Sequence, residues 1–235
     1  MSPTWKELED DAERLTLDNH HDEVALAEDL ERHVLSGFET LQSTATSSPI
    51  QELVYLLAVG ATNSLHLAFD LALKGWHAQS LSLTRNAFEF WLAGAYVVCE
   101  PGEAPVLKEP NSKWPRPLKM RKRISETLGG QDVGTESIRH AVDKTYDYLC
   151  KFPHPTFASV GSIYHADGSL RMGPFYNRTR LLICLDNAYR TATLVGTLLE
   201  TCFPTLQGTQ WSQRGQSLTD RVNVWARTVV VAKDE

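Results

Sequence analysis

The sequence predicts an all-α protein, a helical bundle built around one long αα-hairpin at residues 49–98. Apolar residues recur at helical spacing through several long segments. Ser48 and Pro49 form a strong helix start, because serine caps the free amides and proline is tolerated in the first turn. Gly75 stands where one helix ends and the next begins, and a link this short makes the two helices antiparallel.

Residues 1–46 are predicted to form an acidic helical extension, and residues 47–235 the core domain. Thr4 and Glu7 have the spacing of a capping box and predict a first helix. Apolar residues at helical spacing predict a second helix that ends before the polar run at 42–48.

Beyond the hairpin, five prolines make residues 101–117 a connection rather than a regular helix. We expect helices at 118–128, 135–150, 177–201 and 217–232, although the valines near the last end are also compatible with a strand. Asp167-Gly168 is typical of a tight turn and predicts a small β-hairpin at 162–172.

Composition indicates a globular, cytoplasmic protein without a membrane span. Hydrophobic residues make up 42% and charged residues 22% of the chain, which is ordinary for a folded domain. No apolar run reaches the length of about 18 residues that a span needs, and the acidic start has no signal-peptide character. The four cysteines form no C-x-x-C pair, so we expect buried thiols and no cofactor.

Charge is distributed unevenly along the chain, which has a net charge of −6. Residues 1–32 hold eleven acids against three bases, and residues 108–123 hold seven bases against one acid. Both regions can be solvated faces, or can face each other within or between subunits. The basic region can instead contact nucleic-acid phosphates. The candidate residues for that contact are Lys113, Trp114, Arg116, Lys119, Arg121, Lys122 and Arg123.

Two polar stripes interrupt the apolar hairpin at positions i, i+3 and i+7: Asn63, His66 and Asp70 in the first helix, and Ser82, Arg85 and Glu89 in the second. A buried arginine needs a partner, and Glu89 lies one turn from Arg85. One interpretation is a structural pair whose hydrogen bonds His66 or Asn63 complete. The other is a pocket in which Arg85 is the cation, Glu89 the acid or base and His66 a proton shuttle.

A metal site is not the preferred interpretation, because the hairpin has no Glu-x-x-His or H-E-x-x-H pattern. His154 is a further candidate, since two flanking prolines hold it on a rigid loop. Such rigidity is typical of a catalytic histidine and equally of a buried structural one.

A family resemblance is carried by the hairpin helix at Leu83–Trp91, the pairs Tyr148-Leu149 and His154-Pro155, the Asp167-Gly168 turn and the long helix that follows it. In these features the chain resembles a family of bacterial helical-bundle proteins. That family is similar to the HEPN superfamily, and the resemblance covers about residues 50–200. It implies a homodimeric ribonuclease, or an inactive relative, of toxin–antitoxin and phage-defence systems. The HEPN signature is an arginine and a polar residue followed by a histidine; here Arg85-Asn86 matches, but Glu89 stands near the position of the histidine.

We therefore expect a HEPN-like homodimer that binds or cleaves RNA, as a metal-independent endoribonuclease if it is an enzyme. Arg85, Glu89 and His154 are the expected catalytic residues, with His66, Asn86 and Asn63 in support. The alternative is a non-enzymatic helical module that binds a partner protein or a small ligand, in which the polar stripes are purely structural.

Overall fold

A computed structural model describes residues 3–42, 48–128, 142–151 and 173–231. All regular elements in these ranges are helical and none is a strand, so the all-α prediction is confirmed for this part of the chain. The β-hairpin expected at 162–172 and the candidate residue His154 lie outside the described residues.

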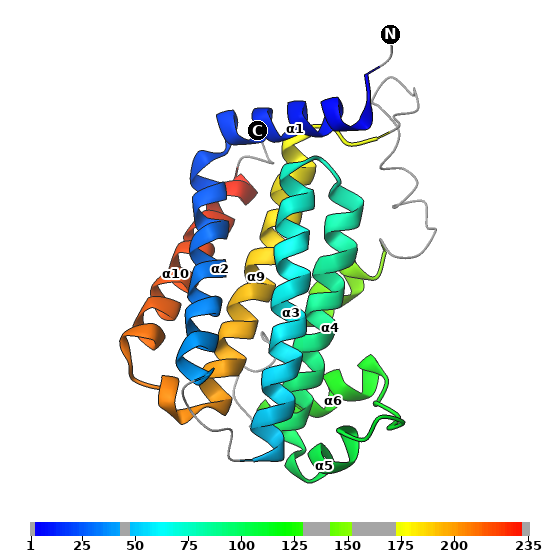
Figure 1. The fold of residues 1–235 in the computed structure, drawn as a ribbon, viewed down its shortest axis with the longest axis vertical. Coiled ribbons are helices and arrows are strands. Elements are labelled where there is room, and N and C mark those ends of the chain that lie inside the picture. The colour runs from blue at the N-terminus through cyan, green and yellow to red at the C-terminus, as the bar shows by residue number, and fades with distance from the viewer. Residues whose placement is uncertain (1–2, 43–47, 129–141, 152–172, 232–235) are drawn as a thin grey trace.

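Five long helices run side by side to form the bundle, and a sixth, α1, lies across one end of it (Figure 1). The long helices are α1 (Trp5–Asn19), α2 (His21–Gln42), α3 (Pro49–Leu73), α4 (His77–Cys99), α9 (Arg178–Cys202) and α10 (Gln210–Val231). The shorter ones are η1 (Pro101–Glu103), α5 (Ala104–Leu107), α6 (Pro117–Leu128) and η2 (Pro204–Leu206), and residues 142–149 are also helical.

The predicted αα-hairpin is confirmed as α3 and α4, which pack along their whole length. The Ser48 hydroxyl accepts the Gln51 N–H at 3.2 Å, so the predicted cap is present. Gly75 has a φ of 83°, and a Cβ atom there would lie 2.5 Å from the backbone nitrogen of Phe175. The turn therefore needs glycine both for its backbone conformation and for space.

Helix α9 is the centre of the core, because it packs against α3 and α4 on one side and against α2 and α10 on the other. Leu181, Leu185 and Tyr189 of α9 are fully buried. Leu30 and Val34 of α2 belong to the same hydrophobic core. Thus α2, which the sequence assigns to an N-terminal extension, packs as a member of the bundle.

Helix α3 is the one described helix whose length and composition would suit a membrane span. Its small and apolar side chains pack against α4 and α9, and Leu56 and Leu67 remain more than half exposed.

Two predicted boundaries were wrong. The proline-rich connection contains the short helices η1 and α5, because proline is tolerated in a first turn. Helix α10 begins at Gln210 rather than Ser217. The Thr209 hydroxyl accepts the Ser212 N–H at 3.4 Å, and Trp211 packs on α2, so a local cap and a distant contact both extend this helix.

Candidate functional site

Arg85 and Glu89 lie one turn apart on α4 and form the expected pair. Arg85 Nε donates to Glu89 Oε1 at 3.0 Å, and Arg85 Nη2 forms an ion pair with the same oxygen at 2.9 Å. The side chains are 18% and 34% exposed. The pair is therefore half-buried.

Two residues that the sequence did not assign to this site complete it. The Tyr146 hydroxyl donates to the same Glu89 oxygen at 3.3 Å. The guanidinium group of Arg121, from α6, lies 4.4 Å from the centre of the Tyr146 ring. We refer to Arg85, Glu89, Tyr146 and Arg121 as the Arg85 network; it joins α4 to α6 and to the helical segment 142–149.

The protonation states of the Arg85 network favour a stable ion pair. Burial raises the pKa of Tyr146 to about 12, and contact with Cys150 adds to this, so the tyrosine remains a neutral donor. Burial acts to lower the pKa of Arg85, but the attraction of Glu89 and the other neighbours outweighs it and the net shift is upward. Arg85 is thus a permanent cation whose charge Glu89 already balances.

Arg121 was expected on a nucleic-acid-binding surface, and the structure places it inside the bundle. Its side chain is 11% exposed, and Nη1 donates to Asp143 at 2.9 Å and to Asp147 at 3.3 Å. Its Nε atom is buried and has no hydrogen-bond partner among the described residues. Arg121 therefore holds α6 on the bundle, and the exposed positive charge of the basic region comes from its neighbours.

The expected supporting residues lie on other faces of the hairpin. His66 is exposed and contacts Glu31 of α2 at 3.2 Å. Asn86 donates to the Ser64 hydroxyl at 3.0 Å, and Asn63 is exposed. Within the described ranges no hydrogen bond or ion pair joins any of these three to Arg85 or Glu89. His154 is not described, so its proposed approach to Arg85 stays a prediction.

Several bases of the basic region are neutralised by nearby carboxylates. Arg123 pairs with Glu100, and Lys122 lies 3.9 Å from Glu126. Lys108, the first base of this region, pairs with Glu52 near the start of α3. The pairs of Arg123 and Lys108 tie α6 and the end of α5 to the hairpin, and all three contacts lower the net charge that a ligand would meet.

Three bases of the same region are different. Lys113, Arg116 and Lys119 are exposed and have no ion pair within the part of the chain that the structure describes. The indole of Trp114, which lies among them in the sequence, is also exposed. We call these four residues the cationic segment. The Arg116 carbonyl accepts the Lys119 N–H at 2.9 Å, so the segment leads into the first turn of α6.

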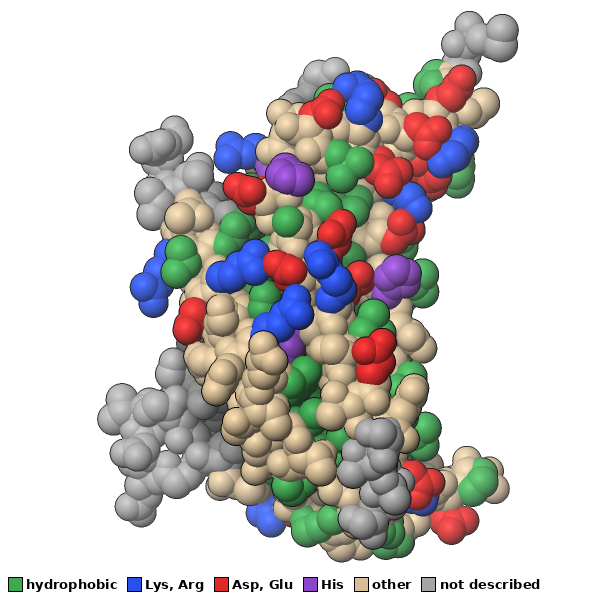
Figure 2. Space-filling view, turned by 60° about the vertical axis from the view of Figure 1, so that its left-hand side comes forward, with side chains coloured by type: hydrophobic (Ala, Val, Ile, Leu, Met, Phe, Trp, Pro, Cys, Tyr) green, Lys and Arg blue, Asp and Glu red, His purple; other side chains and the backbone are tan. Residues whose placement is uncertain are grey.

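The acidic and basic regions lie at opposite ends of the bundle. Helix α1 crosses one end, and α5 and α6 lie at the other (Figure 1). Acidic side chains gather on the α1 end (Figure 2). The two regions therefore do not face each other within one subunit, and a contact between subunits stays a prediction.

Metal ligation receives no support from the described residues, in which no group of three or more His, Cys, Asp and Glu side chains is placed to hold an ion. The four cysteines are free thiols, with Cys184 fully buried.

Comparison of the chain with protein-family models, curated proteins and solved structures finds no match.

Proposed function

We propose that this protein binds single-stranded RNA through the cationic segment at one end of its bundle. The observation that carries the proposal is the contrast within one short stretch: Arg121 and Arg123 are paired with carboxylates, whereas Lys113, Arg116 and Lys119 are exposed and unpaired within the described chain. An acidic protein that keeps three neighbouring cations free of ion pairs can attract a polyanion at that place.

The position of Lys119 adds to the argument, because Lys119 lies in the first turn of α6 and Arg116 directly precedes that helix. A helix N-terminus carries a partial positive charge, so cations in the first turn cost stability, roughly 0.3–1 kcal/mol each. No acidic residue occupies the first turn of α6 to offset this. A bound phosphate would relieve the repulsion. Trp114 supplies an aromatic surface on which a base can stack without sequence preference.

In this proposal the Arg85 network supports the binding segment. Arg116 and Arg121 are separated by five residues, or about 7.5 Å along a helix axis. Arg121 is held by the Tyr146 ring and by Asp143, and so fixes α6 on the bundle.

Cleavage of RNA by Arg85, Glu89 and His154 is the stronger form of the proposal. It requires a phosphate to displace Glu89 from Arg85. The toxin or defence role and the homodimer follow from the resemblance alone and stay predictions.

Binding can be tested by fluorescence anisotropy with a labelled single-stranded RNA at several salt concentrations. Three phosphate contacts predict that log K falls against log salt with a slope of about −2, from about −0.7 per contact on single strands. The variant Lys113→Gln/Arg116→Gln/Lys119→Gln should lose binding. Arg190→Gln is the matched control, because Arg190 is an exposed arginine paired with Asp186 on α9. Equal affinity of the triple variant and wild type would refute RNA binding at this segment.

Cleavage is tested separately with total RNA and the variant Arg85→Gln. Cleavage by wild type that this variant loses, while it still binds RNA, would assign Arg85 to the reaction. Binding by wild type with no cleavage under any condition would leave a binding protein. If wild type binds no RNA, the alternative of a module for a partner protein is favoured, and the Arg85 network is then purely structural.

A further inference from the structure

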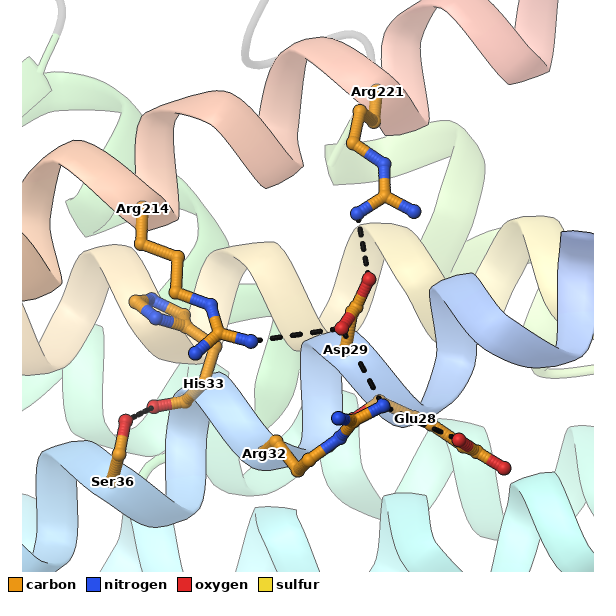
Figure 3. A network of polar contacts seen from close by, with 7 residues as sticks. All are labelled: Glu28, Asp29, Arg32, His33, Ser36, Arg214 and Arg221. Atoms are coloured by element: carbon orange, nitrogen blue, oxygen red, sulfur yellow. Dashed lines mark hydrogen bonds and ion pairs between the residues drawn. The ribbon is translucent and has the colours of Figure 1, made fainter.

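The contact between α2 and α10 contains a second polar cluster, on the opposite side of α9 from α4. Asp29 of α2 is approached by three arginines: Arg221 at 2.7 Å, Arg32 at 3.5 Å and Arg214 at 3.6 Å. Arg214 and Arg221 reach Asp29 from α10, whereas Arg32 approaches it from α2 itself (Figure 3), and Lys and Arg side chains gather at mid-height of this face (Figure 2). Arg32 is also shared with Glu28, so three cations meet two carboxylates.

Arg214 is the least satisfied member of this cluster. Its distance of 3.6 Å from Asp29 exceeds a hydrogen bond, and within the described chain its guanidinium makes no other polar contact that would use its five donors. Arg221 donates one hydrogen bond, to Asp29, and Arg32 donates two, to the side chain and the backbone carbonyl of Glu28. The three guanidinium groups thus have more N–H donors than these contacts use.

A groove of about 580 Å³ begins at Arg214. Its other lining residues are Ser36, Thr40, Gln210, Trp211 and Gln213. The side-chain amides of Gln210 and Gln213 make no hydrogen bond to any described residue and can both donate and accept. The groove is open to solvent and Trp211 is its one apolar lining residue, so it offers a bound molecule a single aromatic surface among polar groups.

The wall of the groove is held rigidly. Trp211 Nε1 donates to the His33 carbonyl at 2.8 Å, and the two rings stack with centres 4.2 Å apart. Gly215 leaves the room for this, since a Cβ atom there would lie 2.8 Å from His33 Nε2. Burial and the charge of Arg214 lower the pKa of His33 to about 4. The ring is therefore neutral, and the arginines alone supply positive charge.

We infer that this groove binds a small molecule that carries a phosphate monoester. The phosphate is held by Arg214, which lines the groove, Arg32 and Arg221 add positive charge beside it, and the rest of the molecule lies against Trp211 and the two glutamine side chains. Guanidinium groups recognise phosphate through paired, charge-assisted hydrogen bonds. The carboxylates of Glu28 and Asp29 beside the site disfavour a long polyanion, so a small ligand fits better than RNA. The inference is independent of the proposed RNA binding.

The test is calorimetric titration of the full chain with adenosine monophosphate, inorganic phosphate and adenosine, all at one ionic strength. Adenosine monophosphate should bind, inorganic phosphate should bind more weakly, and adenosine should not bind. Arg214→Gln should weaken binding of the monophosphate about tenfold to a hundredfold, the loss expected for charged hydrogen bonds. Arg190→Gln, an exposed arginine on α9 outside the cluster, should bind as wild type does.

Asp29→Asn provides a variant with the opposite sign. It removes a negative charge that competes with phosphate for the three arginines, so affinity for the monophosphate should rise. Its melting temperature should fall without ligand and recover more than that of wild type with ligand. Absence of binding by wild type, or an affinity of Arg214→Gln equal to that of wild type, would overturn the inference. The affinity measured for Arg214→Gln does not depend on whether Asp29→Asn folds.

Discussion

Glu89→Ala should destabilise the protein substantially, because Glu89 Oε1 is the common acceptor of the Arg85 network. This oxygen accepts one hydrogen bond from Arg85 Nε and one from Tyr146, and it forms an ion pair with Arg85 Nη2. Exposed ion pairs contribute about 1 kcal/mol or less, whereas breaking a buried pair costs about 3–5 kcal/mol. With side chains 18% and 34% exposed, the loss should lie between these limits, at about 2–3 kcal/mol.

The assay is chemical unfolding followed by circular dichroism, with thermal melts in parallel. For a chain of this size the expected fall in melting temperature is about 5–10 °C. The control is Asp186→Ala, which breaks an i, i+4 pair with Arg190 on α9 that is more exposed; it should cost about 0.5 kcal/mol or less.

A double-mutant cycle with Arg85→Ala isolates the pair. Each single variant leaves a partner without its counterpart, so the double variant should be more stable than the sum of the single losses predicts, by about 1–2 kcal/mol. If Glu89→Ala loses no more stability than the Asp186 control, the reasoning is refuted. Arg85 would then be held without its carboxylate and free to take a ligand.

Further predictions concern backbone conformation and pH. Gly75→Ala should lose more stability than Gly208→Ala, because both positions have positive φ but only Gly75 lies against other backbone. Gly102→Ala should be nearly neutral. Similar unfolding midpoints for all three variants would contradict this prediction. His33 and His77 both have their pKa lowered to about 4, chiefly by burial. The unfolded chain therefore binds more protons between pH 4 and 6.5, and the free energy of unfolding should fall as the pH is lowered through this range. Urea midpoints measured from pH 7 to 4 check this, and a flat profile would show that these histidines titrate normally in the folded protein.

The helices could be predicted because their signals are local. The capping residues Thr4 and Ser48 act within three residues of their own positions, and both caps are present. The pairing of Arg85 with Glu89 was also predictable, since residues four apart share a helix face. The start of α10 was predicted less well, because its first turn depends on the contact of Trp211 with His33.

The partners of the candidate site could not be predicted in the same way. Tyr146 meets Glu89 across 57 residues of sequence, and Arg221 meets Asp29 across 192. No sequence spacing between Tyr146 and Glu89, or between Arg221 and Asp29, indicates that these side chains meet. Arg121 illustrates the problem: in the sequence it is one more base of the basic region, and only the packing of α6 on α4 turns it inward.

The sequence by itself determined the helical hairpin, the pairing of Arg85 with Glu89 and the presence of an acidic and a basic region, because these depend on neighbours within one or two helical turns. The tertiary structure decided which bases are neutralised, where the two charged regions lie relative to each other and which arginines converge on Asp29. Such features depend on how distant helices pack. Burial and long-range contacts, which no local pattern encodes, settle whether a charged side chain is paired inside the bundle or left available to a ligand.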